Sequence, residues 1–162
     1  MKESTANAVA EKNIVLFKLN NQIFGIDICH VRRIMEHSEI SSFPNAPDFI
    51  EGVLKIGKHI ILIIDLIKKL KLKSDKKDSV NSKILVCKLN NFVIGLSVDS
   101  VIGVSLVKLD AIEKVPDFIN QHIDNINVEG TSVIDNDLVI LLNLENIINR
   151  SEITYYANQH SI

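Results

Sequence analysis

Apolar residues follow strand-like patterns in two long stretches of the chain. Residues 14–31 read IVLFKLNNQIFGIDICHV, and residues 84–101 read ILVCKLNNFVIGLSVDSV. In each stretch an apolar run leads into Asn-Asn, and alternation of apolar and polar positions follows, as in Ile26-Asp27-Ile28. Alternation with a period of two is typical of a half-buried strand, and Asn tolerates the left-handed backbone of a tight turn. Each stretch therefore predicts a β-hairpin.

The two stretches are copies of one unit. The segment KLNN occurs in both, and Gly25 matches Gly95 at the same offset of 70 residues. The segment PDFI begins at Pro47 and recurs at Pro116, at an offset of 69. An ordered series of such matches indicates a duplication, and a single duplication predicts two lobes rather than a solenoid. The two glycines are expected at a bulge or at a barrel corner.

Each copy continues with a loop that contains proline, a second pair of strands and a short helix. The expected strands are Val53–Ile56, Ile60–Ile64, Gly130–Ile134 and Leu138–Leu142. Asp65 and Asn143 stand at N-cap positions ahead of the expected helices, Leu66–Leu70 and Leu144–Ile148. Five short strands per copy favour a closed sheet. The expected fold class is therefore all-β, with two similar five-stranded barrels packed together and short helices.

A polar, lysine-rich stretch at 68–78 separates the copies. A solvated linker is the usual explanation for such a stretch, and a nucleic-acid patch is the alternative. The expected division is a tail at 1–12, lobe one at about 13–72, a linker at 73–82, lobe two at about 83–150 and a tail at 151–162.

Composition narrows the class of partner. The net charge of −2 provides no strong field for nucleic acid or anionic lipid. No apolar run approaches the roughly 18 residues of a spanning helix, and the polar start does not resemble a secretory signal, so we expect a cytoplasmic protein without direct membrane insertion. Cys29 and Cys87 stand alone in apolar runs, without a CxxC motif, and are both expected as small core residues in a reducing compartment.

No catalytic or metal-binding pattern emerges from the residues that carry chemistry. His30 and His37 lie near Glu36 and Glu39 in the sequence, which could suggest a metal site, but surface histidines are the favoured interpretation. A phosphate-loop-like Gly-Lys pair is followed by His59 instead of Ser or Thr. Asp27 and Asp99 are expected as exposed polar partners on alternating strands. The rival hypothesis is a small enzyme that uses Asp27, His30 or His59; the favoured one is a binding protein without catalytic residues, metal or cofactor.

Five longer motifs occur in a fixed order along residues 13–150. FKLNNQIFGIDICHVRRI fits F-x-L, a turn, an aromatic residue and then I-x-I-x-x-V-x-x-I. A loop with prolines leads to PDFIEGV and later to IILIIDL. GLSVDSVIGV fits G-x-x-V-D-x-V-x-x-V, and LVILLNLENII follows as a closing strand and helix. In this order the motifs resemble those of the CheW family of chemotaxis adaptors.

This resemblance implies two five-stranded SH3-like barrels and a role without catalysis. Family members link the cytoplasmic tips of chemoreceptors to the histidine kinase CheA in membrane-associated arrays. The receptor hairpin packs into an apolar groove between the lobes, and lobe edges bind the CheA regulatory domain. The alternatives are a CheW-like adaptor of a type IV pilus twitching-motility pathway, and a divergent paralogue with changed partners.

The motifs also imply which residues contact partners. The candidates from V-x-x-I, F-I-x-G-V and V-D-x-V are Val31, Ile34, Gly52, Val53, Val98, Asp99 and Val101. Core positions are the favoured interpretation of Val98 and Val101, because apolar residues are mostly inside. Asp99 is the stronger surface candidate, because an ionised carboxylate is rarely buried without a partner.

Two departures from the family pattern concern charge. Gly57 stands where the family usually has the arginine of N-L-R-G, and Arg33 stands where it often has an acidic residue. Lys58 or His59 could supply the missing positive charge. We therefore add Arg33, Gly57 and Lys58 to the candidate partner-binding residues. An inverted charge at an interface acts mainly by rejecting wrong partners, so altered partner specificity is the hypothesis.

Overall fold

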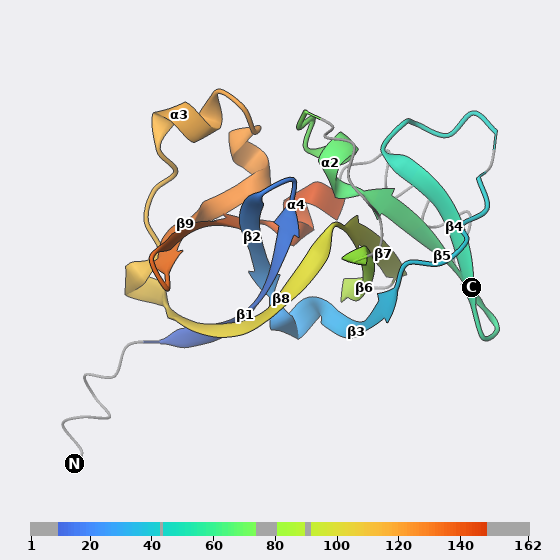
Figure 1. The fold of residues 1–162 in the computed structure, drawn as a ribbon, viewed down its shortest axis with the longest axis horizontal. Coiled ribbons are helices and arrows are strands. Elements are labelled where there is room, and N and C mark those ends of the chain that lie inside the picture. The colour runs from blue at the N-terminus through green and yellow to red at the C-terminus, as the bar shows by residue number, and fades with distance from the viewer. Residues whose placement is uncertain (1–9, 43, 74–80, 90–91, 149–162) are drawn as a thin grey trace, which may run out of the picture.

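Two five-stranded sheets, each curled into a small barrel, build the computed structural model, which describes residues 10–42, 44–73, 81–89 and 92–148 (Figure 1). In spatial order the first sheet contains β8 (Ser100–Lys108), β1 (Glu11–Leu19), β2 (Gln22–Asp27), β10 (Asp137–Leu142) and β9 (Val128–Ile134). The second contains β3 (Val31–Glu36), β6 (Lys83–Leu89), β7 (Phe92–Val98), β5 (His59–Asp65) and β4 (Ile50–Ile56). The predicted fold class is confirmed.

Short helices connect these strands. The 3-10 segments are η1 (Ile28–His30), η3 (Leu109–Ala111) and η4 (Asn125–Asn127), and the α-helices are α2 (Leu66–Lys69), α3 (Asp117–Asn120) and α4 (Leu144–Ile148). Both predicted caps are confirmed. Asp65 Oδ1 accepts from Ile67 N at 3.0 Å, and Asn143 Oδ1 accepts from Asn146 N at 3.1 Å.

The two copies of the repeat exchange strands. The hairpin β1–β2 from the first copy lies in one sheet with β8, β9 and β10 from the second copy. Reciprocally, β6–β7 lies with β3, β4 and β5. The prediction that 13–72 and 83–150 each form their own lobe is therefore wrong. After β2, η1 leads the chain to the other sheet, where β3 pairs with β6. The alternating pattern of the strands does not indicate which sheet β3 joins.

Pairing in the two sheets supports the duplication. In the first sheet Leu141 of β10 pairs in parallel with Gly25 of β2, and in the second Ile63 of β5 pairs in parallel with Gly95 of β7. Gly25 and Gly95 lie in regular register rather than at a bulge. A Cβ at Gly25 would overlap Ile14 Cγ2, and one at Gly95 would lie 2.5 Å from Ile63 Cδ1. Close packing inside each barrel is thus the reason for glycine.

Each barrel is closed by one short bridge outside the named strands. Ser41 N donates to Val53 O at 3.0 Å and Val53 N donates back to Ser41 O at 2.8 Å. In the other barrel, Glu113 and Thr131 exchange the equivalent pair of hydrogen bonds, at 2.7 and 2.9 Å. The chain after β3 and after β8 therefore reaches the opposite edge of its own sheet.

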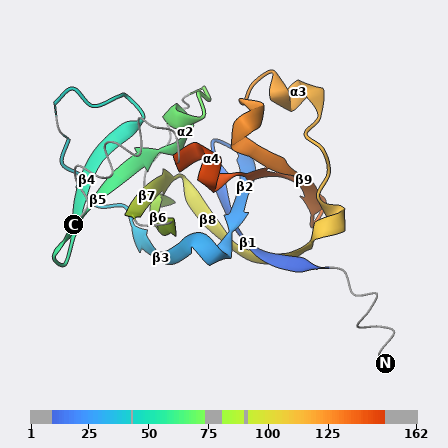
Figure 2. The same cartoon turned by 180° about the vertical axis from the view of Figure 1, so that it is seen from behind.

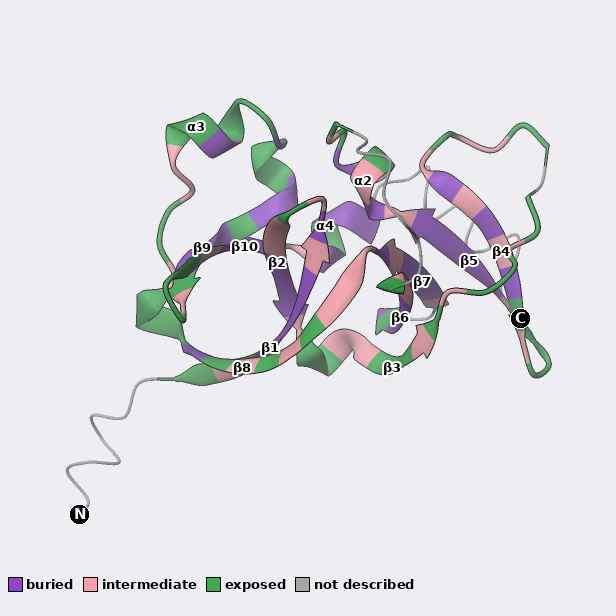
Figure 3. Ribbon diagram, in the orientation of Figure 1, coloured by how far each residue is buried: buried purple, intermediate pink, exposed green. Residues whose placement is uncertain are grey.

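Three clusters of buried apolar residues form the core. Successive residues of β5 alternate between them: Ile61 and Ile63 belong to a small cluster inside the second barrel, and Leu62 and Ile64 to a large cluster shared by both sheets. Helices α2 and α4 add residues to the shared cluster and lie between the barrels (Figures 1 and 2). Burial on both faces explains the uninterrupted apolar run 60–64, because such a strand has no solvent face (Figure 3).

Some predictions fall wholly or partly outside the described residues. Asn20 takes φ of +58° in the two-residue turn between β1 and β2, as predicted, but the equivalent turn at 90–91 is outside that part of the chain. The same holds for most of the tail 1–12, most of the linker 73–82 and all of the tail 151–162. Strand β1 begins at Glu11, inside the expected tail.

Candidate protein-interaction site

An apolar ridge lies on β8, at the edge of the first sheet. Its residues Ile102, Val104 and Leu106 are 49%, 55% and 57% exposed. They occupy alternate positions, so their side chains lie on one face of the strand. Among the described strands β8 pairs only with β1. Exposed apolar residues that cluster in this way mark interaction sites. We call Ile102, Val104 and Leu106 the β8 ridge.

The motif comparison did not find the β8 ridge. In the run VIGVSLVK the positions that alternate with the ridge are Gly103, Ser105 and the buried Val107. Usually the more apolar set of an alternating strand faces the core, and here it faces solvent. The small residues Gly103 and Ser105 at the inward positions were the sequence signal that could have revealed the ridge.

Strand β3 is the corresponding edge of the second sheet. Val31 is half-buried and packs against the shared core, and it pairs with Cys87 just as Val101 of β8 pairs with Phe17. Arg33 and Ile34 are both exposed, Ile34 by 44%. A register shift between Val31 and Arg33 interrupts the alternation. Arg33 and Ile34 are thus available to a partner, and Val31 only in part.

The second group of candidates closes and caps the second barrel. Gly52 is buried with φ of +154°, and a Cβ there would overlap the carbonyl oxygen of Ser41. Val53 is half-buried and forms the closing bridge with Ser41. Gly57, with φ of +60°, and Lys58 form the exposed turn between β4 and β5. Figure 1 shows this hairpin tip at the outer end of the second barrel, away from β8.

The third group lies where the chain passes from β7 to β8. Val98 is 2% exposed, so the core interpretation holds for it. Val101 is half-buried and packs against the shared core. Asp99 was expected to be exposed, but it is half-buried and its Oδ2 accepts from Asn20 N at 2.6 Å. These residues connect the barrels, and the structure does not present Val98 to a partner.

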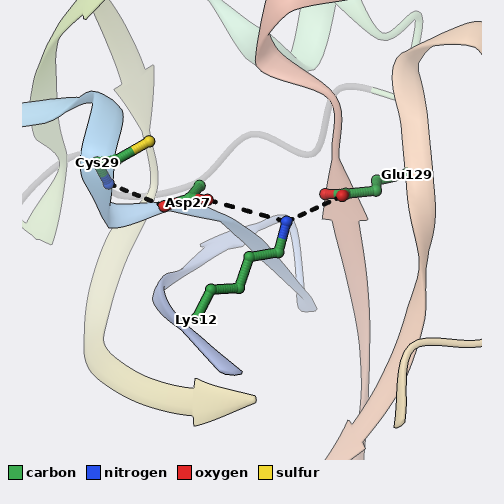
Figure 4. Close-up of polar contacts among 4 residues, drawn as sticks. All are labelled: Lys12, Asp27, Cys29 and Glu129. Atoms are coloured by element: carbon green, nitrogen blue, oxygen red, sulfur yellow. Dashed lines mark hydrogen bonds and ion pairs between the residues drawn. The ribbon is translucent and has the colours of Figure 1, made fainter. Parts of the chain in front are cut away.

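Figure 4 shows a polar cluster at the end of the first barrel. Lys12 Nζ on β1 lies 2.9 Å from Glu129 Oε2 on β9 and 3.8 Å from Asp27 Oδ2. Asp27 Oδ1 in turn accepts from Cys29 N at 2.9 Å. Asp27 is therefore half-buried and bonded, not the exposed strand residue that we expected. Because β1 and β9 are not neighbours in the sheet, the Lys12–Glu129 pair spans the barrel end.

The two cysteines have different environments. Cys87 is buried in the shared core, and burial raises its pKa to about 12. Cys29 is exposed, so the expectation that it is a core residue is wrong. Its pKa is also raised, first by partial burial and then by its hydrogen bond to Asp27 and the charge of that carboxylate. Both thiols are therefore protonated at neutral pH, and neither is an activated nucleophile.

The histidines in the described part of the chain do not form a metal-binding cluster. His37 Nε2 lies 2.9 Å from Glu51 Oε2, and His30 lines a small hollow beside Asp27 and Lys12. His59 is not among the residues that line this hollow. Within the described ranges no group of three His, Cys, Asp or Glu side chains could hold a metal ion. Over the same ranges no helix is long and apolar enough to cross a membrane.

Comparisons of the sequence and of the fold with known proteins identify relatives of this chain. The model of the CheW-like domain family matches residues 13–152. The chemotaxis protein CheW of Klebsiella aerogenes is 27% identical over 153 residues, which cover 94% of this chain and 91% of that protein. The CheW of Thermotoga maritima is also 27% identical, over 90% of this chain and 93% of the relative. The crystal structure of the scaffolding protein TtCheW from Thermoanaerobacter tengcongensis superimposes with a TM-score of 0.79 and 29% identity, covering 88% of this chain and 91% of that one.

Proposed function

Because the chain belongs to the CheW-like domain family, we propose that it is a non-catalytic adaptor that links chemoreceptor tips to a CheA-type histidine kinase in chemotaxis. The observation that carries the proposal is the β8 ridge, an exposed apolar surface on an edge strand of the first sheet. An adaptor needs surfaces for two partners, and the two barrels offer different edges. In the cell it would work within membrane-associated receptor arrays.

The β8 ridge suits the receptor, whose tip is a helical hairpin in the proposed assembly. Alternate residues of a strand lie about 6.6 Å apart, so the ridge is about 13 Å long. That length corresponds to roughly two and a half turns of a helix with a pitch of 5.4 Å. Apolar residues at helical spacing on the receptor could pack along it, as in other helix-in-groove complexes. Ile34 and the half-buried Val31 and Val101 would extend this contact on the two edge strands.

The kinase would bind the outer part of the second barrel. Its regulatory domain is expected to be CheW-like, so the contact would join barrel to barrel. Gly52 and Val53 shape the edge strand β4, and Gly57 and Lys58 form the exposed turn at its end. Several moderate contacts of this kind can sum through the multivalency of an array.

The positive charge of Arg33 and the lack of a charge at Gly57 favour a second candidate function, that of a paralogue with changed partners. Arg33 is exposed and Gly57 has open space around it, so neither residue is required by the core. Substituting Arg33→Glu should alter the affinity for one partner about tenfold if this charge selects partners. If the variant binds both partners with the same affinities as the wild-type protein, Arg33 is removed from the proposal.

Binding assays on purified protein test the adaptor proposal. We expect Val104→Glu to weaken binding of a receptor signalling fragment at least tenfold, with the kinase regulatory domain still bound. The matched control is Val133→Glu, because Val133 on β9 is 67% exposed but lies on the other edge of the first sheet. Unchanged receptor binding by Val104→Glu would contradict the assignment of the β8 ridge.

A pull-down of the native complex separates the pathways. Recovery of a CheA-type kinase with chemoreceptors supports the chemotaxis role, and recovery of the kinase of a twitching-motility system supports the pilus pathway instead. Recovery of neither kinase would contradict the adaptor proposal.

A further inference from the structure

Charge is divided unequally between the two barrels. The first barrel with its helices, residues 11–27 and 100–148, carries four Lys or Arg and ten Asp or Glu, a net charge of −6. The second, residues 28–73 and 81–98, carries ten Lys or Arg and five Asp or Glu, a net charge of +5. The net charge of the whole chain, −2, conceals this polarity. Acidic and basic ends of two such molecules attract each other within the screening length, about 10 Å in 0.1 M salt.

The duplication places opposite charges at equivalent hairpin tips. Strands β4 and β5 are joined by a two-residue turn, and so are their counterparts in the other copy, β9 and β10. The β4–β5 hairpin carries Lys55 and Lys58 at its end, which we call the basic tip. The β9–β10 hairpin carries Asp135 and Asp137, which we call the acidic tip. The two copies of one hairpin have therefore become complementary in charge.

Both tips are available to a partner. All four of their charged side chains are exposed, and none forms an ion pair with another described residue. Figures 1 and 2 show the β4–β5 hairpin at one end of the molecule and β9 at the opposite side, beyond the first barrel. The two tips of one molecule therefore do not meet, and an ion pair between them needs two molecules.

An exposed apolar residue stands beside the acidic tip. Val133, two positions before Asp135 on β9, is 67% exposed, the largest fraction among the large apolar residues that the structure describes. Exposed ion pairs contribute only about 0.2–1 kcal/mol each, so a contact between tips also needs an apolar anchor. At the basic tip Gly57 has open space around it, into which Val133 of a second copy could pack.

We propose that copies of this chain associate head to tail, with the basic tip of one copy against the acidic tip of the next. Such a contact joins two different surfaces, so it builds open chains or closed rings instead of a symmetric dimer. Exposed ion pairs with one apolar anchor make the contact weak and sensitive to salt. The basic tip is also part of the surface proposed for the kinase, so a second copy would compete with the kinase there.

Sedimentation velocity of the full-length protein, without receptor or kinase, tests the proposal. In about 0.1 M salt we expect the weight-average sedimentation coefficient to rise with protein concentration. In about 1 M salt, where the screening length is about 3 Å, this rise should disappear.

Charge reversal at each tip provides a stricter test. Lys55→Glu with Lys58→Glu makes both tips acidic, and Asp135→Lys with Asp137→Lys makes both tips basic. Each double variant alone should remain monomeric because like charges then meet at the contact. An equal mixture of the two should associate again, since every contact between unlike variants restores opposite charges. This recovery also guards against a folding defect, because misfolded variants would not restore each other.

The matched control is Lys68→Glu with Lys88→Glu, because both lysines are exposed on the second barrel and neither lies on β4 or β5. It changes the net charge by the same amount and should associate within about threefold of the wild type, since charges beyond the screening length act weakly. A monomeric wild type, association that persists in 1 M salt, or a mixture that stays monomeric would overturn the proposal. Tip variants that change only the binding of the kinase regulatory domain would overturn it too, because the basic tip would then serve the kinase. None of these results decides the adaptor role, whose readout is the binding of receptor and kinase.

Discussion

The carboxylate of Asp99 accepts a hydrogen bond from the backbone N–H of Asn20 at 2.6 Å, across 79 residues of sequence. Asp99 lies where the chain leaves β7 in one barrel for β8 in the other, and Asn20 lies in the turn between β1 and β2. Asp99 N also donates to Lys18 O at 3.0 Å. Asn20 Nδ2 donates to Lys73 O at 2.7 Å. The crossover between the barrels is thus tied to the first hairpin by the residue that the V-D-x-V motif had suggested as a partner contact.

The first prediction concerns this crossover. Asp99→Ala should lower the free energy of unfolding by about 1.5–3 kcal/mol, because a hydrogen bond to a charged acceptor is lost and Asn20 N is left without a partner. Urea unfolding followed by circular dichroism measures the change. Asp110→Ala is the control, since Asp110 is exposed in η3. Equal stability of the two variants would show that Asp99 does not hold the crossover.

Substitutions at two glycines test the cost of backbone strain and the cost of steric overlap separately. Gly52 and Gly103 have nearly the same φ, +154° and +156°. A Cβ at Gly52 would overlap Ser41 O, whereas one at Gly103 would meet no atom within 4 Å. We expect Gly103→Ala to cost about 1 kcal/mol from strain alone, and Gly52→Ala to cost roughly 3 kcal/mol or more. Denaturant midpoints of the two variants check this, and similar values would contradict the overlap at Gly52.

Thiol labelling distinguishes the two cysteines. In the native protein at pH 8 a disulfide reagent should modify Cys29, which is exposed, and leave Cys87, which is buried. Because the pKa of Cys29 is raised, its labelling should be slower than that of a small model thiol at the same pH. Asp27→Asn removes the carboxylate charge that contributes to this shift, so it should speed the labelling of Cys29. A rate unchanged by Asp27→Asn would contradict the role of that charge.

Burial of Cys87 predicts a loss of stability at alkaline pH. Its pKa in the folded protein is about 12, whereas an exposed thiol in the unfolded chain titrates near 8.5. Above about pH 9 the unfolded state releases this proton first, so the free energy of unfolding falls as pH rises towards the folded pKa. One thiol changes the slope by at most about 1.4 kcal/mol per pH unit. Cys87→Ala should show a shallower decline between pH 8.5 and 10.5 in urea unfolding; parallel curves would refute this.

An ion-pair cycle tests the cluster at the end of the first barrel. Lys12→Glu places like charges beside Glu129 and Asp27 and should destabilise the fold by about 1 kcal/mol at low salt. Adding Glu129→Lys should restore part of this loss, because the opposite charges meet again. The double-mutant cycle should give a coupling that shrinks in 1 M salt, where the screening length is about 3 Å. Additive effects of the two substitutions would mean that the ion pair contributes nothing.

Features that depend on neighbouring residues could be read from the sequence. The hairpin around Asn20, the caps at Asp65 and Asn143 and the duplication all follow from local geometry and spacing. Chemical reasoning about residue types also sufficed to favour the core for Val98. The family followed from motif order, and the matched family model confirms it.

Features that depend on which strands meet were decided only by the tertiary structure. Each copy could pair its strands within itself or with the other copy, and the same alternating pattern satisfies both arrangements. The exchange of strands places Asp99 at a crossover rather than on an open surface, and it leaves the β8 ridge facing solvent. Cys29 is exposed for a similar reason, because η1 interrupts the strand pattern as the chain changes sheets. The sequence by itself determined the hairpins and the helix caps, because their hydrogen bonds are local. The contact surfaces depend on the pairing of strands that are far apart in the chain, and no local pattern encodes that pairing.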